Sequence, residues 1–281
     1  MPLGADSLRH GSCWCGHLGG VCQPDGGPDV FPGARVGGHH GVVDRVALSL
    51  RVDEWEAPDW PVVTILVDGR ELTDVVGGRS FVGFDPDQIL SDEEPLVPGV
   101  LPERIAVYRC HCGEPGCGCI APLIIRRGSE ILWRDARDYT GVFVKPSLDR
   151  PPTATGTRLR MPELRFDAAQ YEAEVRRAAQ DRSWETDRRA TARLLRSMLG
   201  ESESLLGAGY GLQWVVPERN AVPTFSVSLL DPSRVQVVVE VEAPAQDPDK
   251  WAAELAQTLL AKRPEEWRVA FRGNFEWPPV Q

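Results

Sequence analysis

Four cysteines lie close together in the middle of the chain, as the pairs Cys110-x-Cys112 and Cys117-x-Cys119. Side chains of a β-strand alternate between its two faces, so the members of each pair share a face. A turn at 113–116 would place Cys112 opposite Cys117 and Cys110 opposite Cys119. The four sulfurs would then converge in the tetrahedral thiolate set that zinc prefers. The spacing therefore predicts a zinc-binding hairpin.

The chemistry of such a site depends on how many ligands the protein supplies. Four thiolates fill the coordination sphere of zinc and leave no position for water or substrate, which favours a structural over a catalytic ion. An iron–sulfur cluster is the less favoured alternative, because four cysteines also bind iron. Cross-strand disulfides satisfy the geometry, but a cytoplasmic location disfavours them. His111 would point to the opposite face and would become a ligand only if the backbone kinks there.

A second group of possible ligands occurs near the N-terminus: Cys13, Cys15, His17 and Cys22. Their spacing permits a zinc site, but no strand pattern around them would orient the side chains. Residues 1–42 are rich in glycine and histidine and lack apolar periodicity, so we expect a disordered tail.

Composition excludes several function classes. The formal net charge of −10 argues against binding a nucleic-acid backbone. No apolar run approaches the roughly 18 residues of a membrane span, and no export signal is evident, so we expect a cytoplasmic protein. Beyond the tail, His111 is the only histidine, so any Ser–His–acid or Cys–His catalysis would have to use it. No complete catalytic set is recognisable, which disfavours an enzyme.

Hydrophobic patterning predicts an α+β fold beyond the tail. Alternating and β-branched runs indicate a mainly β domain over 43–150. Prolines followed by a charged helical pattern indicate a linker and a long helix over 151–199. The apolar stripe of this helix is interrupted near 181–183, where a bend or a break is expected. The remaining residues, 200–281, predict a compact α+β domain with the element order β-β-β-α-β, a helix packed on one face of an antiparallel sheet.

The boundaries of these helices and strands carry recognisable signals. Asp167 is placed as the N-cap of the long helix with Gln170 as its capping-box partner, and Phe166 and Tyr171 occupy the hydrophobic-staple positions. Gly200 is placed as the stop. The C-terminal domain is expected to have strands at 212–216, 224–230 and 235–241, a helix that starts at Pro248 and ends at Pro264, and a last strand at 267–271.

One block of the chain resembles other proteins. The stretch YRCHCGEPGCGCIAPLI, from Tyr108, and the later ILWRDARDYTGVF resemble a recurrent block in uncharacterised proteins of high-GC bacteria. The similarity covers about residues 43–145. It implies a shared fold and a shared metal, but no known activity.

Together these features predict a non-enzymatic, zinc-stabilised intracellular protein that acts by binding another protein, as an adaptor, regulator or neutralising partner. The alternative is a thiol redox sensor or a zinc-dependent enzyme centred on Cys110–Cys119. Arginine and aromatic side chains dominate interface hot spots. The candidate partner-binding residues are Arg137, Asp138, Tyr139, Trp184, Arg188 and Arg189.

Overall fold

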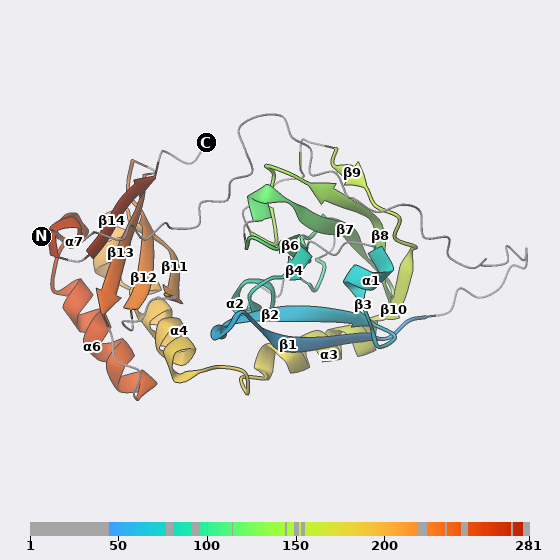
Figure 1. Cartoon of the computed structure of the whole chain (residues 1–281), viewed down its shortest axis with the longest axis horizontal. Coiled ribbons are helices and arrows are strands. Elements are labelled where there is room, and N and C mark those ends of the chain that lie inside the picture. The colour runs from blue at the N-terminus through green and yellow to red at the C-terminus, as the bar shows by residue number, and fades with distance from the viewer. Residues whose placement is uncertain are drawn as a thin grey trace, which may run out of the picture. The chain divides into compact units, whose positions relative to one another are not determined.

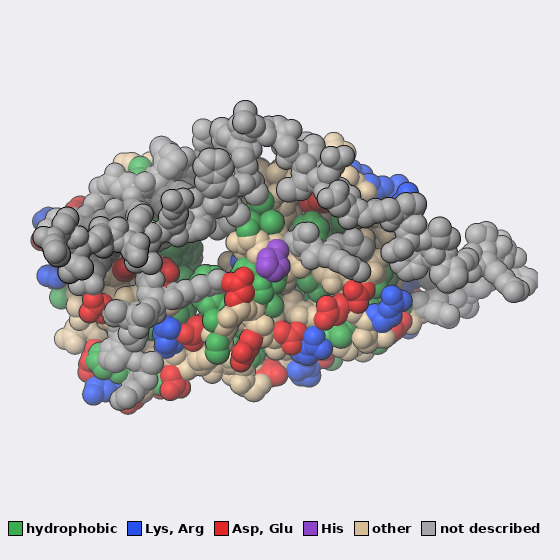
Figure 2. All heavy atoms as spheres, in the orientation of Figure 1, with side chains coloured by type: hydrophobic (Ala, Val, Ile, Leu, Met, Phe, Trp, Pro, Cys, Tyr) green, Lys and Arg blue, Asp and Glu red, His purple; other side chains and the backbone are tan. Residues whose placement is uncertain are grey.

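The computed structural model describes residues 45–76, 81–91, 96–99, 101–113, 115–143, 145–148, 152, 155–218, 224–233, 235–242, 247–270 and 272–277. The expected tail and its candidate ligands Cys13, Cys15, His17 and Cys22 lie outside these residues. Acidic and basic side chains are interspersed over the face shown in Figure 2. Within the described residues, no helix has both the length and the apolar content needed to span a bilayer.

The chain divides into two compact units (Figure 1). Unit 1 comprises the described residues up to 53 and 62–180, and unit 2 comprises 54–61 and those from 181 onward. Both contain helices and antiparallel strands, which confirms the α+β class. The boundary at 180/181 falls within the segment predicted to be a linker and one long helix.

The first sheet of unit 1 is a meander with one buried face and one solvent-exposed face. Leu48 and Leu50 are buried while Ser49 and Arg51 are exposed, as the alternation in this segment predicts. Asp68 and Gly69 both have positive φ, 49° and 76°, the conformation of a tight two-residue hairpin turn. The elements are β1 (Leu48–Trp55), β2 (Ala57–Val67), β3 (Arg70–Glu71) and the short helix α1 (Leu72–Val76).

The second sheet of unit 1 has seven described strands, in the order β10-β8-β7-β6-β4 with β5 paired to β7 and β9 to β8. All described pairs in it are antiparallel. The strands are β4 (Phe81–Gly83), β5 (Glu103–Arg104), β6 (Tyr108–Cys110), β7 (Cys119–Arg127), β8 (Glu130–Tyr139), β9 (Thr157–Arg158) and β10 (Leu164–Asp167), with the short helix α2 (Pro86–Ile89) after β4.

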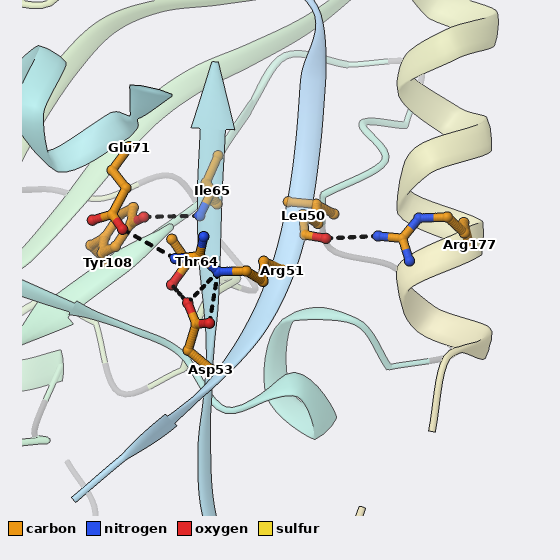
Figure 3. Close-up of polar contacts among 8 residues, drawn as sticks. All are labelled: Leu50, Arg51, Asp53, Thr64, Ile65, Glu71, Tyr108 and Arg177. Atoms are coloured by element: carbon orange, nitrogen blue, oxygen red, sulfur yellow. Dashed lines mark hydrogen bonds and ion pairs between the residues drawn. The ribbon is translucent and has the colours of Figure 1, made fainter. Parts of the chain in front are cut away.

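The two sheets meet where β2 crosses β4. The Val63 N–H donates to the Phe84 carbonyl at 2.8 Å, and a Cβ on Gly83 would lie 2.0 Å from the Val63 carbonyl oxygen. Only glycine permits this approach. The Tyr108 hydroxyl accepts a hydrogen bond from the Ile65 N–H at 2.9 Å (Figure 3), which ties the strand before the cysteine turn to the first sheet.

Helix α3 (Ala168–Gln180) closes the core of unit 1. The carboxylate of Asp167 accepts hydrogen bonds from the N–H groups of Ala169 and Gln170, both at 3.1 Å, which confirms the predicted N-cap. The rings of Phe166 and Tyr171 lie 5.4 Å apart, which confirms the staple. The Gln170 side chain does not return to the cap. It instead bonds both backbone groups of Leu48 in β1.

Two further side chains of α3 also bond the backbone of β1. Glu174 accepts the Leu50 N–H at 2.7 Å. Arg177 donates to the Leu50 carbonyl at 2.7 Å, a contact shown in Figure 3. Together with Gln170, these side chains bond backbone N–H and C=O groups at the edge of β1, as a neighbouring strand would. The helix therefore completes the first sheet through side chains.

The predicted long helix is two helices. Helix α3 ends at Gln180, and α4 (Asp187–Gly200) begins with Thr186 as its N-cap, whose side chain accepts the Arg189 N–H. The Asp181 side chain accepts hydrogen bonds from Ser183, a local turn that competes with helix continuation. The interruption in the apolar stripe therefore marks a true break, whereas the predicted end at Gly200 is confirmed.

Unit 2 is a helical layer on one face of an antiparallel four-stranded sheet, in the order β11-β12-β13-β14. Residues of α4 and α6 form one core with alternate residues of β11, β12 and β13. The elements after α4 are α5 (Glu203–Gly207), β11 (Gly211–Pro217), β12 (Thr224–Leu230), β13 (Gln236–Glu242), α6 (Pro248–Leu260), α7 (Pro264–Ala270) and β14 (Arg272–Trp277).

The predicted last strand at 267–271 is wrong. Residues up to Ala270 form helix α7, and strand β14 begins at Arg272. The predicted end of the preceding helix at Pro264 is also wrong, because α6 ends at Leu260 with Ala261 as its C-cap. Pro264 instead occupies the first position of α7, where its missing N–H costs nothing. Trp267 is fully buried and donates to the Leu259 carbonyl at 3.0 Å, so it anchors α7 against α6. Tertiary packing of this one indole outweighs the alternating pattern.

Candidate metal centre

The cysteine segment folds as a tight turn rather than the predicted regular hairpin. Strand β6 ends at Cys110, residues 111–112 turn, and a 3-10 helix (Pro115–Cys117) leads into β7. The Gly113 N–H donates to the Cys110 carbonyl at 2.8 Å, and the Cys110 N–H donates to the Gly118 carbonyl at 2.7 Å. Because the chain turns directly after Cys110, the expected pairing of Cys112 with Cys117 across two strands does not form.

Three of the four predicted ligands come together at this turn. The sulfurs of Cys110, Cys112 and Cys117 all lie within 4.8 Å of one another. Ligand sulfurs at about 2.3 Å from a tetrahedral zinc ion are roughly 3.8 Å apart, so small side-chain rotations suffice to close the set. Cys112 is exposed, and the other two are half-buried. The three thiols could therefore bind a metal ion at the surface of unit 1.

The fourth predicted ligand, Cys119, lies outside this group. In the register of β6 and β7 it is opposite Arg109, not Cys110, and its side chain is fully buried in the core of unit 1. Burial, with a smaller contribution from the Asp138 carboxylate, raises the pKa of the Cys119 thiol to about 12. The thiol is thus protonated and apolar in character at neutral pH. The one-residue shift in register turns a predicted ligand into a core residue.

The remaining ligand candidate in this segment, His111, is exposed and lies in the turn. The backbone does kink at this residue, which is the condition under which a histidine here would become a ligand. Among the described residues, no histidine, carboxylate or further cysteine joins the three thiols within the same distance. The candidate ligands that the structure brings together are therefore Cys110, Cys112 and Cys117.

The Cys110 thiol ionises less easily than an ordinary cysteine. Burial raises the pKa of the Cys110 thiol above its ordinary value. A bound cation has the opposite effect on its ligands, because it stabilises the thiolate directly. Metal binding at the turn would therefore release protons and would strengthen as the pH rises.

A carboxylate lies close behind the turn. Asp138 is half-buried on β8, opposite Ile120, and its Oδ1 would lie 3.7 Å from a Cβ on Gly118. Burial raises the pKa of Asp138 above its usual range, although the Cys119 N–H donates to the carboxylate. Oδ1 itself is shielded from solvent and has no hydrogen-bond partner among the described residues.

Most of the predicted partner-binding residues have structural contacts. Tyr139 is 3% exposed and Arg189 is 4% exposed, so neither presents its side chain to a partner. Arg188 forms an ion pair with Asp59 at 2.6 Å, on the hairpin tip that belongs to unit 2. Trp184 is half-buried, with the guanidiniums of Arg182 and Arg189 5.6 and 5.8 Å from its ring centre.

A second polar cluster, centred on Asp135, gathers arginines that the sequence did not place together. Its carboxylate pairs with Arg104 at 2.7 Å and Arg137 at 2.9 Å, and Arg158 lies at 3.8 Å. Burial raises the pKa of Asp135, but hydrogen bonds from Arg137 and Arg104 outweigh burial and hold it below its usual value. The spacing Asp135-x-Arg137 was the only local signal, because the other two arginines come from distant strands.

The site is thus built from three thiols on one turn, with a buried thiol and a shielded carboxylate behind it. The resemblance to Cys-rich proteins of high-GC bacteria stays a prediction. In comparisons with known proteins, no family model, curated protein or solved structure matches the chain.

Proposed function

We propose that the turn holds one soft divalent ion, zinc first among the candidates, through the thiolates of Cys110, Cys112 and Cys117. The single observation that carries this proposal is the convergence of the three sulfurs within 4.8 Å. Thiolates select zinc over the hard cations magnesium and calcium. The ion stabilises the connection between β6 and β7, where three glycines and a proline surround the ligands. An iron–sulfur cluster is less favoured, because it usually takes four cysteines.

Metal analysis of protein purified without chelators tests this proposal. We expect about one equivalent of zinc per chain in the wild type and in Cys119→Ser, since Cys119 is not a ligand. The variants Cys112→Ser and Cys117→Ser should lose most of the metal, because removal of one of three thiolates leaves too few ligands. Wild-type protein without metal after reducing, anaerobic purification would reject the zinc turn. Loss of zinc in a folded Cys119→Ser variant would show that Cys119 is a fourth ligand.

We further propose that the protein acts by binding another protein, in the cytoplasm, as an adaptor, regulator or neutralising partner. Tyr139 and Arg189 are buried, so they act through folding. The candidate contact is instead the Trp184 indole with its neighbour Arg182, whose side chain is 39% exposed. Tryptophan and arginine are the residues most enriched at interface hot spots, and an indole already flanked by guanidiniums loses little freedom on binding.

Partner capture with matched variants tests this surface. We expect Trp184→Ala to lose a partner that the wild type retains, with an unchanged circular dichroism spectrum. Leu101→Ala is the control, because Leu101 is a large hydrophobic residue that is 74% exposed in unit 1. Equal capture by the wild type and both variants would exclude the Trp184 surface.

The structure also gives one reason to consider a second function, a thiol redox sensor or a zinc-dependent enzyme. Three thiolates leave one position of a tetrahedral ion for water, a substrate or an oxidant, whereas four would close it. The exposed Cys112 is the thiol that a peroxide would reach first. Rapid release of zinc by stoichiometric hydrogen peroxide would favour the sensor. The rate, expressed as the fraction of bound zinc released per unit time, should then be lower in Cys112→Ser than in the wild type. A metal-dependent turnover that a folded His111→Ala variant loses would favour the enzyme.

A further inference from the structure

Four arginines lie on one face of the seven-stranded sheet. Residues paired across antiparallel strands share a face. Arg104 pairs with Leu123 and Leu123 with Arg134, which places both arginines in one cross-strand row. Ala121 pairs with Arg137, and Arg137 with Arg158, which forms the next row on the same face. We call Arg104, Arg134, Arg137 and Arg158, with Asp135, the arginine face.

A bulge in β8 brings the two rows together. The register shifts between Ala121 and Leu123, so that β8 contributes one extra residue there. Asp135 takes the left-handed conformation, with φ of 48°, and its carboxylate reaches the arginine face. Without the bulge, Arg134 and Arg137 would point to opposite faces.

Asp135 does not neutralise this face. Its carboxylate bonds Arg104 and Arg137 at 2.7 and 2.9 Å and lies 3.8 Å from Arg158. Four guanidiniums and one carboxylate leave three positive charges. Like charges directly opposite one another, as Arg137 and Arg158 are, destabilise a sheet unless a counter-charge sits between them. This excess lies in a chain of net charge −10.

The arginine face is partly buried and partly open. The side chain of Arg104 is 11% exposed and that of Arg137 is 23% exposed, whereas that of Arg158 on the edge strand is 78% exposed. Figure 2 shows basic side chains where Figure 1 places β9. Arg104 directs its Nη1 to the carbonyls of Ala121 and Asp135, which holds it in place. The half-buried Arg104 and Arg137 thus form a fixed base, over which the exposed Arg158 can close.

Donors remain on this face after the internal contacts are made. Arg137 uses Nε for Asp135 and Nη1 for the Thr155 carbonyl, at 2.6 Å. Within the described residues, no hydrogen bond engages its Nη2, the Nη atoms of Arg158 or the guanidinium of Arg134. A planar guanidinium presents paired N–H groups that match two oxygens of one anion.

From this arrangement we propose that the arginine face binds a phosphate-type dianion, with Arg158 and Arg134 closing on it over the base formed by Arg104, Arg137 and Asp135. A dianion offsets most of the excess charge, and its several oxygens accept from more than one guanidinium at a time. The same chemistry fits free inorganic phosphate and the phosphate of an organic monoester. This site is separate from the cysteine turn and does not depend on the proposed metal.

Calorimetric titration of the full chain with inorganic phosphate, phenyl phosphate and acetate at low ionic strength tests the proposal. We expect saturable binding of at least one phosphate probe, weaker binding of the monoanion acetate, and loss of affinity as salt screens the charges. Binding of phenyl phosphate alone identifies a phosphate ester as the ligand, and binding of inorganic phosphate identifies the free anion. Absence of saturable binding of both would overturn the proposal.

Three variants locate the site. Arg158→Gln and Arg134→Gln should each weaken binding roughly tenfold, as expected for loss of charge-assisted hydrogen bonds. Arg127→Gln is the matched control, because Arg127 is an exposed arginine at the opposite end of β7 and its variant makes the same change in charge. Asp135→Asn should strengthen binding, since it removes the competing carboxylate and asparagine tolerates positive φ.

Two results would contradict this assignment. Equal weakening by all three glutamine variants would mean that only the net charge matters. Unchanged affinity in folded Arg158→Gln and Arg134→Gln proteins would remove both residues from the site. Cys112→Ser should bind phosphate like the wild type, so failure of the metal proposal and failure of this one are distinguishable.

Discussion

The cysteine turn and the arginine face are both groups of like side chains in unit 1, but they are assembled differently. The three thiols come from eight consecutive residues, so their spacing alone makes them visible in the sequence. The arginines come from β5, β8 and β9 and meet only through strand pairing. Local spacing therefore reveals which residues gather at a turn, whereas sheet register determines which residues gather on a face.

The same difference explains the error within the cysteine motif. Spacing placed all four sulfurs together on the assumption of a regular hairpin, but β6 ends at Cys110 and the register pairs Cys119 with Arg109. The sequence therefore correctly predicted that Cys110, Cys112 and Cys117 lie together at the turn. The position of Cys119 depends on where the long strand β7 begins to face the core, which no short motif specifies.

The largest effect on stability should come from the half-buried base of the arginine face. Arg104→Ala should lower the free energy of unfolding by about 3 kcal/mol, because it removes one of the two close donors to the Asp135 carboxylate and the guanidinium that bonds two backbone carbonyls. Arg158→Ala should change it by less than about 0.5 kcal/mol, since its side chain is 78% exposed. Urea unfolding measures both. Equal losses of unfolding free energy in the two variants would show that Arg104 is no more important to the fold than the exposed Arg158.

A smaller difference should separate the two kinds of cysteine. In metal-free protein, Cys119→Ser should cost about 1–2 kcal/mol, because it buries a hydroxyl in an apolar core. Cys112→Ser should cost less than about 0.5 kcal/mol at its exposed position. Thermal unfolding in the presence of a chelator measures this contrast. A larger loss in Cys112→Ser would mean that the turn has a structural role without metal.

Helix α3 shows which features of secondary structure can be predicted from local sequence. Capping and staple signals at Asp167, Phe166 and Tyr171 are local and were correct. Gln170 has the residue type of a capping-box partner, yet its amide pairs with Leu48, 122 positions earlier in the chain. Local rules were therefore reliable where the competing partner was local. They failed at Gln170, where a distant contact was available, and at the helix containing Trp267, where the indole packs against the preceding helix.

Removal of the Gln170 amide tests this long-range contact. Gln170→Ala should destabilise unit 1 by about 1 kcal/mol, because two backbone groups of Leu48 at the β1 edge lose their partner and can be rehydrated only in part. Helix propensity favours alanine, so the loss cannot come from the helix itself. Hydrogen exchange of the Leu48 amide should accelerate. Unchanged exchange there would indicate that the strand edge does not rely on α3.

The smallest expected effect is a pH dependence at the next residue along this contact, Glu174. Burial raises the pKa of Glu174, but hydrogen bonds from Arg177 and the Leu50 N–H outweigh burial and set it below its ordinary value. A carboxyl whose folded pKa is depressed contributes stability that is present above its unfolded pKa, about 4.3, and is lost as the pH falls through the folded value. Glu174→Gln should therefore flatten the stability profile below about pH 4.5 and lower stability at neutral pH. The matched control is Glu254→Gln, whose carboxylate is 50% exposed and 4.0 Å from Lys250. The free energy of unfolding of Glu174→Gln could instead fall with decreasing pH as steeply as that of the wild type. Protonation of Glu174 would then not be the event that weakens the contact between α3 and β1.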